Sequence, residues 1–241
     1  MATISLCMIV KNESAVLARC LDSIADLMDE IIIVDTGSTD NTKEIAAQYT
    51  SRIYDFKWTS DFSAARNFSF SKATMEYIYT ADADEILDDA NRERFLRLKG
   101  ALLPEIEIVQ MKYVTQGTFD TVLNAKKEYR PKLFRRLRTF TWIDPIHETV
   151  RLTPVTFDSD VEILHCPQSL HSKRDFSIFI KAFEHDGQFS PKIRTMYAKE
   201  LLKTGDKKDF TDAKPIFQLI FDNDPAYDDR KEAACVLARI Y

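Results

Sequence analysis

Glycine is scarce in this chain, which has five glycines among 241 residues. Phosphate-binding loops of the GxGxxG and GxxxxGK(S/T) types need closely spaced glycines, and neither pattern occurs in the sequence. This absence argues against a dinucleotide-dependent dehydrogenase and against a P-loop nucleoside triphosphatase. A diphosphate bound by this chain would have to be held by a metal ion and by side chains.

Cysteine is also scarce, and the four cysteines are far apart in the sequence. No CxxC pair occurs, so zinc-finger spacing is absent, and we expect reduced thiols in a cytosolic protein. No apolar run is long enough to cross a bilayer, and no signal peptide precedes the first apolar segment. We therefore expect a soluble, cytoplasmic protein without a membrane span.

Positive charge is in deficit, with 33 Lys and Arg against 38 Asp and Glu and a net charge of −5. This balance argues against nucleic acid or an anionic membrane as the main partner. The hydrophobic content of 45% is sufficient for a packed core. The length suits one large domain with a small appendage.

Strand and helix patterns alternate four times in the first part of the chain. The expected strands are compact apolar or β-branched runs, at residues 3–10, 30–34, 52–56 and from 77 onward. The expected helices have apolar residues at helical spacing, over residues 14–28, 41–49 and 60–73. Such alternation predicts an α/β fold with a parallel, doubly wound sheet and right-handed crossovers.

The pattern changes in the second part of the chain. Shorter strands are expected in a mixed or antiparallel arrangement, at residues 106–114, 131–137, 148–152 and 161–164. From Ser172 the pattern is helical, with turn residues between amphipathic segments, as in tetratricopeptide-like (TPR-like) repeats. We therefore predict a catalytic domain over 1–170 and a small α-helical segment over 171–241. The last helix lacks a polar cap, so we expect the natural chain to continue.

Three acids follow the strand that begins at Tyr77, namely Asp82, Asp84 and Glu85. Carboxylates this close repel one another, and a divalent cation relieves the repulsion. Oxygen ligands favour Mg²⁺ or Mn²⁺, whose coordination shell substrate phosphates often complete. Ligands of open α/β sheets bind beyond the carboxyl ends of the strands, where this cluster falls. The alternative is that Asp82 and Asp84 are solvated caps of the next helix.

Several ordered segments resemble the signature of family 2 glycosyltransferases with the GT-A fold. The segments are Ile9–Glu13, Val34–Asp40, Ala65–Asn67 and Asp82–Glu85. Later segments resemble the branch of that family with C-terminal tetratricopeptide repeats, namely Lys132–Arg135, His147 and Glu148, His165, and Tyr197–Leu201. The resemblance covers nearly the whole chain, and the order and spacing of the segments carry it.

The resemblance implies a nucleotide-sugar site at the strand ends. The residues it places at this site are Val10, Asn12, Glu13, Asp35, Arg66, Asp82 and Ala83. Asp35 would accept a hydrogen bond from the base, and a carboxylate suits the imide N–H of uracil. Arg66 would face the base or the phosphates. The simpler alternatives are a turn residue for Asp35 and a surface arginine for Arg66.

The resemblance also implies a metal site formed by Asp84 and His165. Asp84 would ligate the ion that bridges the diphosphate. His165 resembles the C-terminal metal-ligand histidine of GT-A enzymes, and an imidazole ligand favours Mn²⁺ over Mg²⁺. In relatives a Tyr-Gly pair often follows this histidine, whereas Cys166 and Pro167 follow here. A structural histidine is the alternative.

The expected activity is transfer of a sugar from a UDP-sugar to an unidentified acceptor, a peptide, protein or glycan, with inversion implied by the resemblance. A carboxylate would deprotonate the acceptor, and we nominate Glu148, with Asp144 and Glu85 as rivals. The helical segment would present a concave surface to a peptide or to a second subunit. Two other classes stay open: a non-catalytic scaffold that recruits partners, and a metal-dependent phosphohydrolase.

Overall fold

The structure is a computed structural model of the whole chain. It describes the residues 1–115, 127–136, 142–143, 145–146, 149–150, 155–166, 172–223 and 227–240. Within those ranges, no helix is both long and apolar enough to cross a membrane. The chain forms two compact units. The first contains Met1–Trp58, Ala64–Trp142 and Val150–Gln168, and the second contains Thr59–Ser63, Ile143–Thr149 and Ser169–Tyr241.

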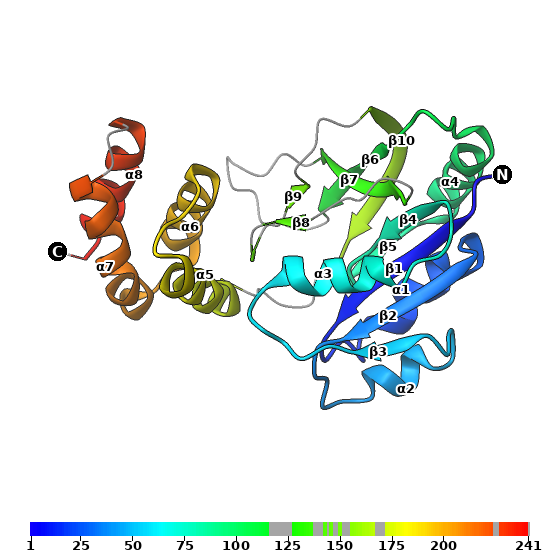
Figure 1. Cartoon of the computed structure of the whole chain (residues 1–241), viewed down its shortest axis with the longest axis horizontal. Helices are drawn as coiled ribbons and strands as arrows, with labels where there is room; N and C mark the ends of the chain where they lie inside the picture. The colour runs from blue at the N-terminus through cyan, green and yellow to red at the C-terminus, as the bar shows by residue number, and fades with distance from the viewer. Residues whose placement is uncertain are drawn as a thin grey trace. The chain divides into compact units, whose positions relative to one another are not determined.

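The first unit contains an eight-stranded sheet of order β3-β2-β1-β4-β7-β6-β10-β5 (Figure 1). Its parallel half consists of β1 (Ile4–Val10), β2 (Glu30–Asp35), β3 (Ile53–Asp55) and β4 (Tyr77–Thr80). The chain moves outward from β1 to β3 and then returns to β4 on the other side of β1. The strand order therefore reverses beside β1, which is where ligands bind in doubly wound sheets.

The other half of the sheet is mixed, as expected. It contains β5 (Glu85–Ile86), β6 (Ile108–Thr115), β7 (Lys127–Arg135) and β10 (Thr156–His165). Strand β7 runs antiparallel to both β4 and β6, whereas β10 runs parallel to β6. A separate two-stranded ribbon joins β8 (Trp142–Ile143) to β9 (Thr149–Val150).

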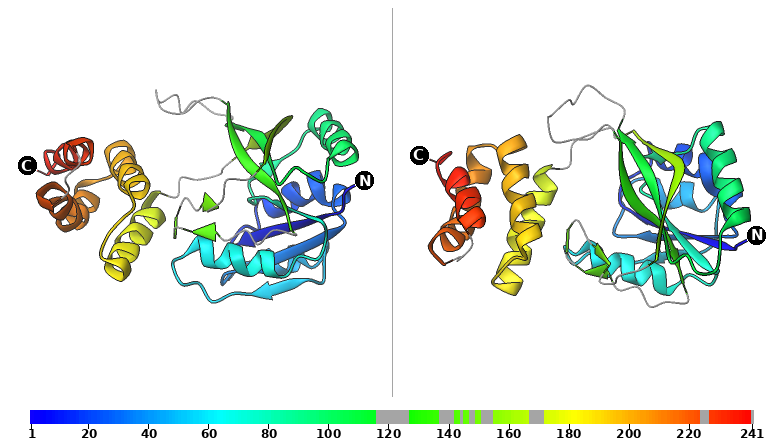
Figure 2. Two further views of the ribbon diagram at one scale, coloured as in Figure 1. Left: turned by 45° about the horizontal axis from the view of Figure 1, so that its top comes forward. Right: turned by 90° about the horizontal axis from the view of Figure 1, so that it is seen from above.

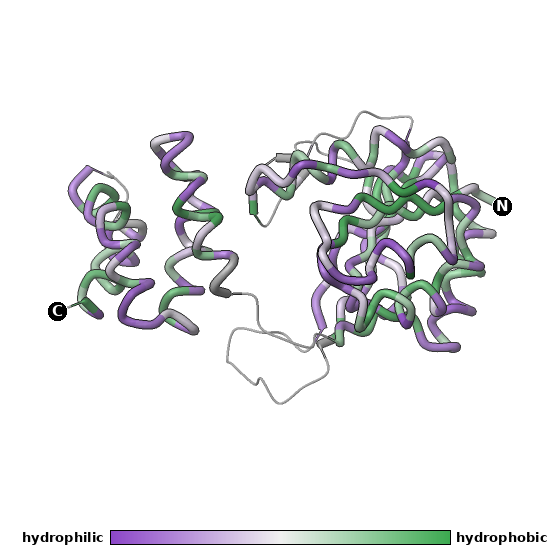
Figure 3. Tube along the Cα trace, turned by 90° about the horizontal axis from the view of Figure 1, so that it is seen from below, coloured by the Kyte–Doolittle hydropathy of each residue, from purple (hydrophilic) through white to green (hydrophobic). Residues whose placement is uncertain are grey.

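Helices cover both faces of the sheet, which confirms the predicted doubly wound α/β architecture. They are α1 (Leu17–Ile24), the 3₁₀ turn η1 (Ala25–Leu27), α2 (Thr42–Ala46), α3 (Phe62–Ser71) and α4 (Asp89–Ala101). Residues of α1, α2 and α4 share one core with the sheet, while the end of α3 packs into a second core on the opposite face (Figure 2). Hydrophobic residues concentrate in the central strands between these layers (Figure 3).

The second unit is mostly helical, with α5 (Ser172–Asp186), α6 (Pro191–Thr204), α7 (Lys207–Asn223) and α8 (Tyr227–Leu237). Its core centres on the fully buried Tyr197, whose ring stacks on Phe179 at a centroid distance of 4.6 Å and contacts Phe217 at 5.3 Å. Gly205 follows α6, and a Cβ there would lie 2.6 Å from the carbonyl of Leu201, so the helix end requires glycine.

Candidate active site

The acid cluster lies in the loop between β4 and β5, at the carboxyl end of the parallel strands. Asp82 exposes 54% of its side chain, whereas Asp84 exposes 20%. The structure brings Asp84 together with His165, although 81 residues separate them, because β5 pairs with the end of β10. The His165 Nε2 lies 2.9 Å from the Asp84 Oδ2. A carboxylate and an imidazole thus meet beside a second, accessible carboxylate.

This donor set fits a divalent ion. Adjacent ligands of an octahedral ion, bound at about 2.1 Å, lie about 3 Å apart, and the Asp84–His165 separation is 2.9 Å. In the described part of the chain, no three acidic, histidine or cysteine side chains form a complete metal site. A Mg²⁺ or Mn²⁺ held by one or two protein ligands takes the rest of its shell from water and phosphate. Asp84 and His165 could therefore hold an ion whose coordination the substrate completes.

Arg66 reaches the same strand ends from α3. Its side chain is 11% exposed, donates to the Thr80 Oγ1, and approaches the Asp82 Oδ1 to 3.9 Å. Burial would raise the pKa of Asp82, but the positive charges of Lys132 and Arg66 outweigh it and lower that pKa. Asp82 is therefore ionised at neutral pH. The site thus combines an exposed negative charge on Asp82 with the largely buried positive charges of Arg66 and Lys132.

Lys132 is a functional candidate that the sequence alone did not single out. In β7, Pro131 pairs with Gln110 and Leu133 pairs with Val109, so Lys132 is the extra residue of a β-bulge. A bulge turns neighbouring side chains toward the same face. The Lys132 Nζ donates to the Glu85 Oε1 at 2.5 Å, with both side chains nearly fully buried. A proline inside a strand pattern was the available signal, because proline marks bulges.

Glu85 is held beneath the acid pair and does not suit a base that must meet an incoming acceptor. Its residue exposure is 2%, and its Oε2 has no hydrogen-bond partner among the described residues. Burial raises the pKa of Glu85, and the nearby Lys132 offsets part of that rise. The other candidate bases, Glu148 and Asp144, lie outside the described residues, as does His147.

Asp35 ends β2 with a fully buried side chain. Its Oδ1 accepts from the backbone N–H groups of Gly37 and Ser38, each at 2.9 Å, and Gly37 has a φ of 105° that favours glycine. Asp35 is thus a turn residue. Its Oδ2, however, is buried without a partner in the described part of the chain. An unpaired buried carboxylate oxygen is costly, so this atom is suited to accept from a ligand N–H.

Asn12 and Glu13 help to join the loop after β1 to the loop after β2. Asn12 has a φ of 56°, and its Oδ1 accepts from the Thr39 N–H at 2.7 Å, while its own N–H donates to the Ser38 Oγ. The Glu13 N–H donates to the Thr42 Oγ1 at 2.8 Å. These bonds fix the two loops that flank the end of β1.

Val10 and Ala83 are both buried; Val10 ends β1, and Ala83 lies in the loop between β4 and β5. The Val10 carbonyl accepts from both the N–H and the hydroxyl of Thr36. The backbone around Val10 is thus fixed by the turn that contains Asp35. These two residues can contribute backbone and shape to the site, because neither carries a polar side chain.

Asp40 anchors the joined loops, and its replacement by asparagine is expected to weaken the fold by about 1–2 kcal/mol at pH 7. Its carboxylate accepts from the Thr42 N–H and hydroxyl and from the Ser14 N–H. Burial would raise the pKa of Asp40, but these bonds outweigh it and lower that pKa to about 2 from 3.8.

Because the folded pKa of Asp40 lies below its unfolded value, its stabilisation is complete above pH 4 and is lost as the pH falls toward 2. The difference in urea-unfolding free energy between wild type and Asp40→Asn should therefore shrink from pH 7 to pH 3. Asp160→Asn, at a side chain 73% exposed, is the control and should change little. A difference independent of pH would contradict this role of the Asp40 charge.

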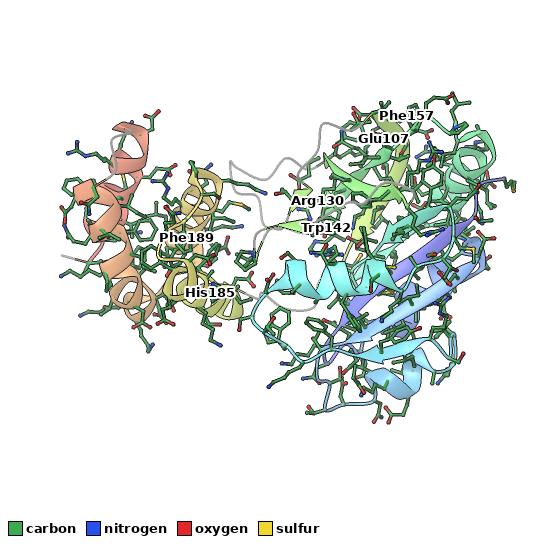
Figure 4. The ribbon with its side chains drawn as sticks, viewed as in Figure 1. Glu107, Arg130, Trp142, Phe157, His185 and Phe189 are labelled. Carbon is green, nitrogen blue, oxygen red and sulfur yellow. The ribbon has the colours of Figure 1, made fainter. Side chains whose placement is uncertain are left out.

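Asn67 fixes the indole that covers Arg66. The Asn67 side chain donates to the Trp142 carbonyl at 3.0 Å and accepts from the Trp142 N–H at 2.9 Å. The Arg66 guanidinium lies 5.0 Å from the centre of the Trp142 ring, and Figure 4 labels Trp142 on β8. Within the Ala65–Asn67 segment, Arg66 therefore faces the site and Asn67 holds the residue that covers Arg66.

The sheet order and the helices on both faces match solved proteins of the GT-A fold. Glucosyl-3-phosphoglycerate synthase of Mycobacterium tuberculosis, solved with Mg²⁺ and UDP, aligns over 79% of this chain and 81% of its own. The TM-score is 0.53 at 17% identity. The same enzyme solved with Mn²⁺, UDP-glucose and phosphoglyceric acid aligns with a TM-score of 0.52. At such identities the similarity establishes the fold.

The sequence model of glycosyl transferase family 2 matches residues 5–153, more than half of the chain, and the chain belongs to this family. A TPR repeat-containing protein of Synechococcus elongatus is 48% identical over 87 residues, 36% of this chain. The glycosyltransferase SunS of Bacillus subtilis is 33% identical over 132 residues, 53% of this chain. The matches cover 22% and 31% of these two relatives' own lengths.

Proposed function

We propose that this chain transfers a sugar from a UDP-sugar to an acceptor hydroxyl or thiol with the help of a divalent metal ion. The observation that carries the proposal is the meeting of Asp84 and His165 at 2.9 Å beside the accessible Asp82. His165 ends β10, and Asp82 and Asp84 follow β4, which lies beside β1 where the strand order reverses. That position is the ligand site of open α/β sheets.

The donor would lie across the ends of β2, β1 and β4. The unpaired Oδ2 of Asp35 would accept from the imide N–H of uracil. Two strand spacings, about 10 Å, separate β2, which Asp35 ends, from β4, which leads into the acid loop, a span that suits a nucleoside between base and diphosphate. Asp84 and His165 would hold the metal, with Asp82 on the ribose or on the metal's water. The bound metal would stabilise charge on the leaving diphosphate.

The acceptor side involves the residues we nominated from the sequence. Glu148 would take the proton from the acceptor as the anomeric carbon is attacked, and a single displacement of this kind inverts the configuration. The helical unit would bind the acceptor, a peptide, protein or glycan, or a second subunit. Its relation to repeat proteins is supported by the name of the Synechococcus relative.

Calorimetric titration of UDP tests the proposal. We expect binding heat with Mn²⁺ or Mg²⁺ and none with EDTA, because Asp84 and His165 would hold the ion and the ion would supply positive charge to the diphosphate. CDP is the matched control, since its ring N3 accepts a hydrogen bond where that of UDP donates one, so it should bind more weakly at Asp35. Equal binding of UDP with and without metal would count against a metal-dependent transferase and favour a scaffold that retains the nucleotide fold.

A further inference from the structure

The orientation of His165 depends on one neighbouring ring. Its Nε2 faces Asp84, and in the part of the chain that the structure describes no group accepts from its Nδ1. Metal-binding histidines usually donate their second ring nitrogen to a carboxylate or carbonyl, which fixes the ring. Packing against a neighbouring ring can supply the same restraint. The Tyr113 ring lies against the imidazole, with centroids 4.9 Å apart and planes inclined by 32°.

Tyr113 is placed for this contact by the register of the sheet. In the parallel pair of β6 and β10, Tyr113 is opposite Ile163 and Thr115 is opposite His165. Tyr113 and His165 are therefore diagonal neighbours on one face, within the reach of an aromatic side chain. Tyr113 is 4% exposed, so its ring cannot move away from His165 without opening the core.

A cation holds the tyrosine in turn. The Arg130 guanidinium, labelled on β7 in Figure 4, lies 3.7 Å from the centre of the Tyr113 ring and covers one of its faces. Lys132 lies 5.6 Å from the same ring. Stacking of a guanidinium on an aromatic face is a favourable contact. Arg130, Tyr113 and His165 therefore form a continuous stack that ends at Asp84.

We infer that Tyr113 is a positioning residue that holds the His165 imidazole in the orientation needed to ligate a divalent metal together with Asp84. The inference rests on the proposed metal site. The stack takes the place of the hydrogen bond that usually orients such a histidine. The ring of Tyr113, and not its hydroxyl, performs this role.

The test uses the whole chain with Mn²⁺ and UDP, and measures Mn²⁺ affinity together with electron spin echo modulation from a ligated ¹⁴N. Wild type and Tyr113→Phe should both show the nitrogen signal and equal affinity. Tyr113→Leu should bind Mn²⁺ about 10-fold or more weakly and lose most of the nitrogen signal. Tyr129→Leu, at a residue 44% exposed on β7, is the control and should match wild type. Tyr113→Met replaces the leucine variant if the latter does not fold.

The outcomes separate this inference from the proposed function. A nitrogen signal that persists at full strength in folded Tyr113→Leu overturns the positioning role and leaves the metal site intact. Loss of affinity in Tyr113→Phe equal to that in Tyr113→Leu overturns the role of the ring, because the hydroxyl would then be responsible. Absence of a nitrogen signal in wild type removes His165 as a ligand, and the inference with it.

Discussion

Asp84→Ala is expected to abolish metal-dependent donor binding and to leave the fold nearly intact. Asp84 supplies one of the two proposed metal ligands. In the alanine variant the His165 imidazole no longer has a carboxylate beside it. Loss of an outer-shell partner of a metal site typically costs 10–100-fold in affinity, so loss of a ligand should cost on the order of 100-fold or more. Calorimetry of UDP with Mn²⁺ gives the affinity directly.

The stability of Asp84→Ala should change by about 1 kcal/mol or less, because a single partly exposed pair contributes little. Its backbone carbonyl still accepts from the Cys166 N–H, so the join between the loop and the end of β10 remains. Asp160→Ala is the matched control, since it removes an exposed aspartate from the same sheet. Unchanged UDP affinity in a folded Asp84→Ala protein would show that the ion, if any, is held elsewhere.

Lys132→Met is expected to be the most destabilising single change near the site, at about 3–5 kcal/mol at pH 7. The side chains of Lys132 and Glu85 are 7% and 2% exposed, so removal of the ammonium leaves a buried carboxylate without its counter-charge. The double variant Lys132→Met with Glu85→Gln should recover more than half of the loss, because no buried charge then remains. Urea unfolding of wild type, both single variants and the double variant gives the interaction free energy between Lys132 and Glu85.

The pH dependence supplies a second arm of this test. Burial raises the folded pKa of Glu85 above its ordinary value of 4.5, and removal of Lys132 raises it further. At a pH between the unfolded-state pKa of Glu85 and its raised pKa in the folded variant, the folded variant binds a proton that the unfolded chain does not. The free energy of unfolding of the variant therefore falls as the pH rises. The penalty of Lys132→Met should therefore be smaller at pH 5 than at pH 7. A loss below about 1 kcal/mol at both pH values would contradict a buried pair.

The apolar runs of the sequence were sufficient to predict most of the sheet. The run at 30–34 became β2 (Glu30–Asp35) and the run at 106–114 became β6 (Ile108–Thr115). Strand starts were less predictable. Strand β7 begins at Lys127, before the predicted 131, because its first five residues are exposed and carry no apolar pattern. Strand β10 likewise begins at Thr156, before the predicted 161, because its first three residues are exposed.

The site was only partly accessible from sequence because its contacts join distant segments. The spacing of the acids and the strand before them pointed to Asp82 and Asp84, and the resemblance to family 2 glycosyltransferases pointed to His165. The signal for Lys132 was weaker, since Pro131 marks a possible bulge but the register shift that places Lys132 shows only in the pairing of β6 and β7. Tyr113 was recognisable as an aromatic residue on a strand, but its contact with His165 depends on how β6 pairs with β10.

The hydrogen bonds between the loops after β1 and β2 have a consequence for the kinetics of donor capture. Asn12 is already hydrogen-bonded to both Ser38 and Thr39 in the free chain. Ordering these segments is therefore completed during folding, and a nucleotide does not have to impose it at the moment of encounter. Binding of a nucleotide at these two loops is then limited by collision and orientation, without a slow preceding rearrangement.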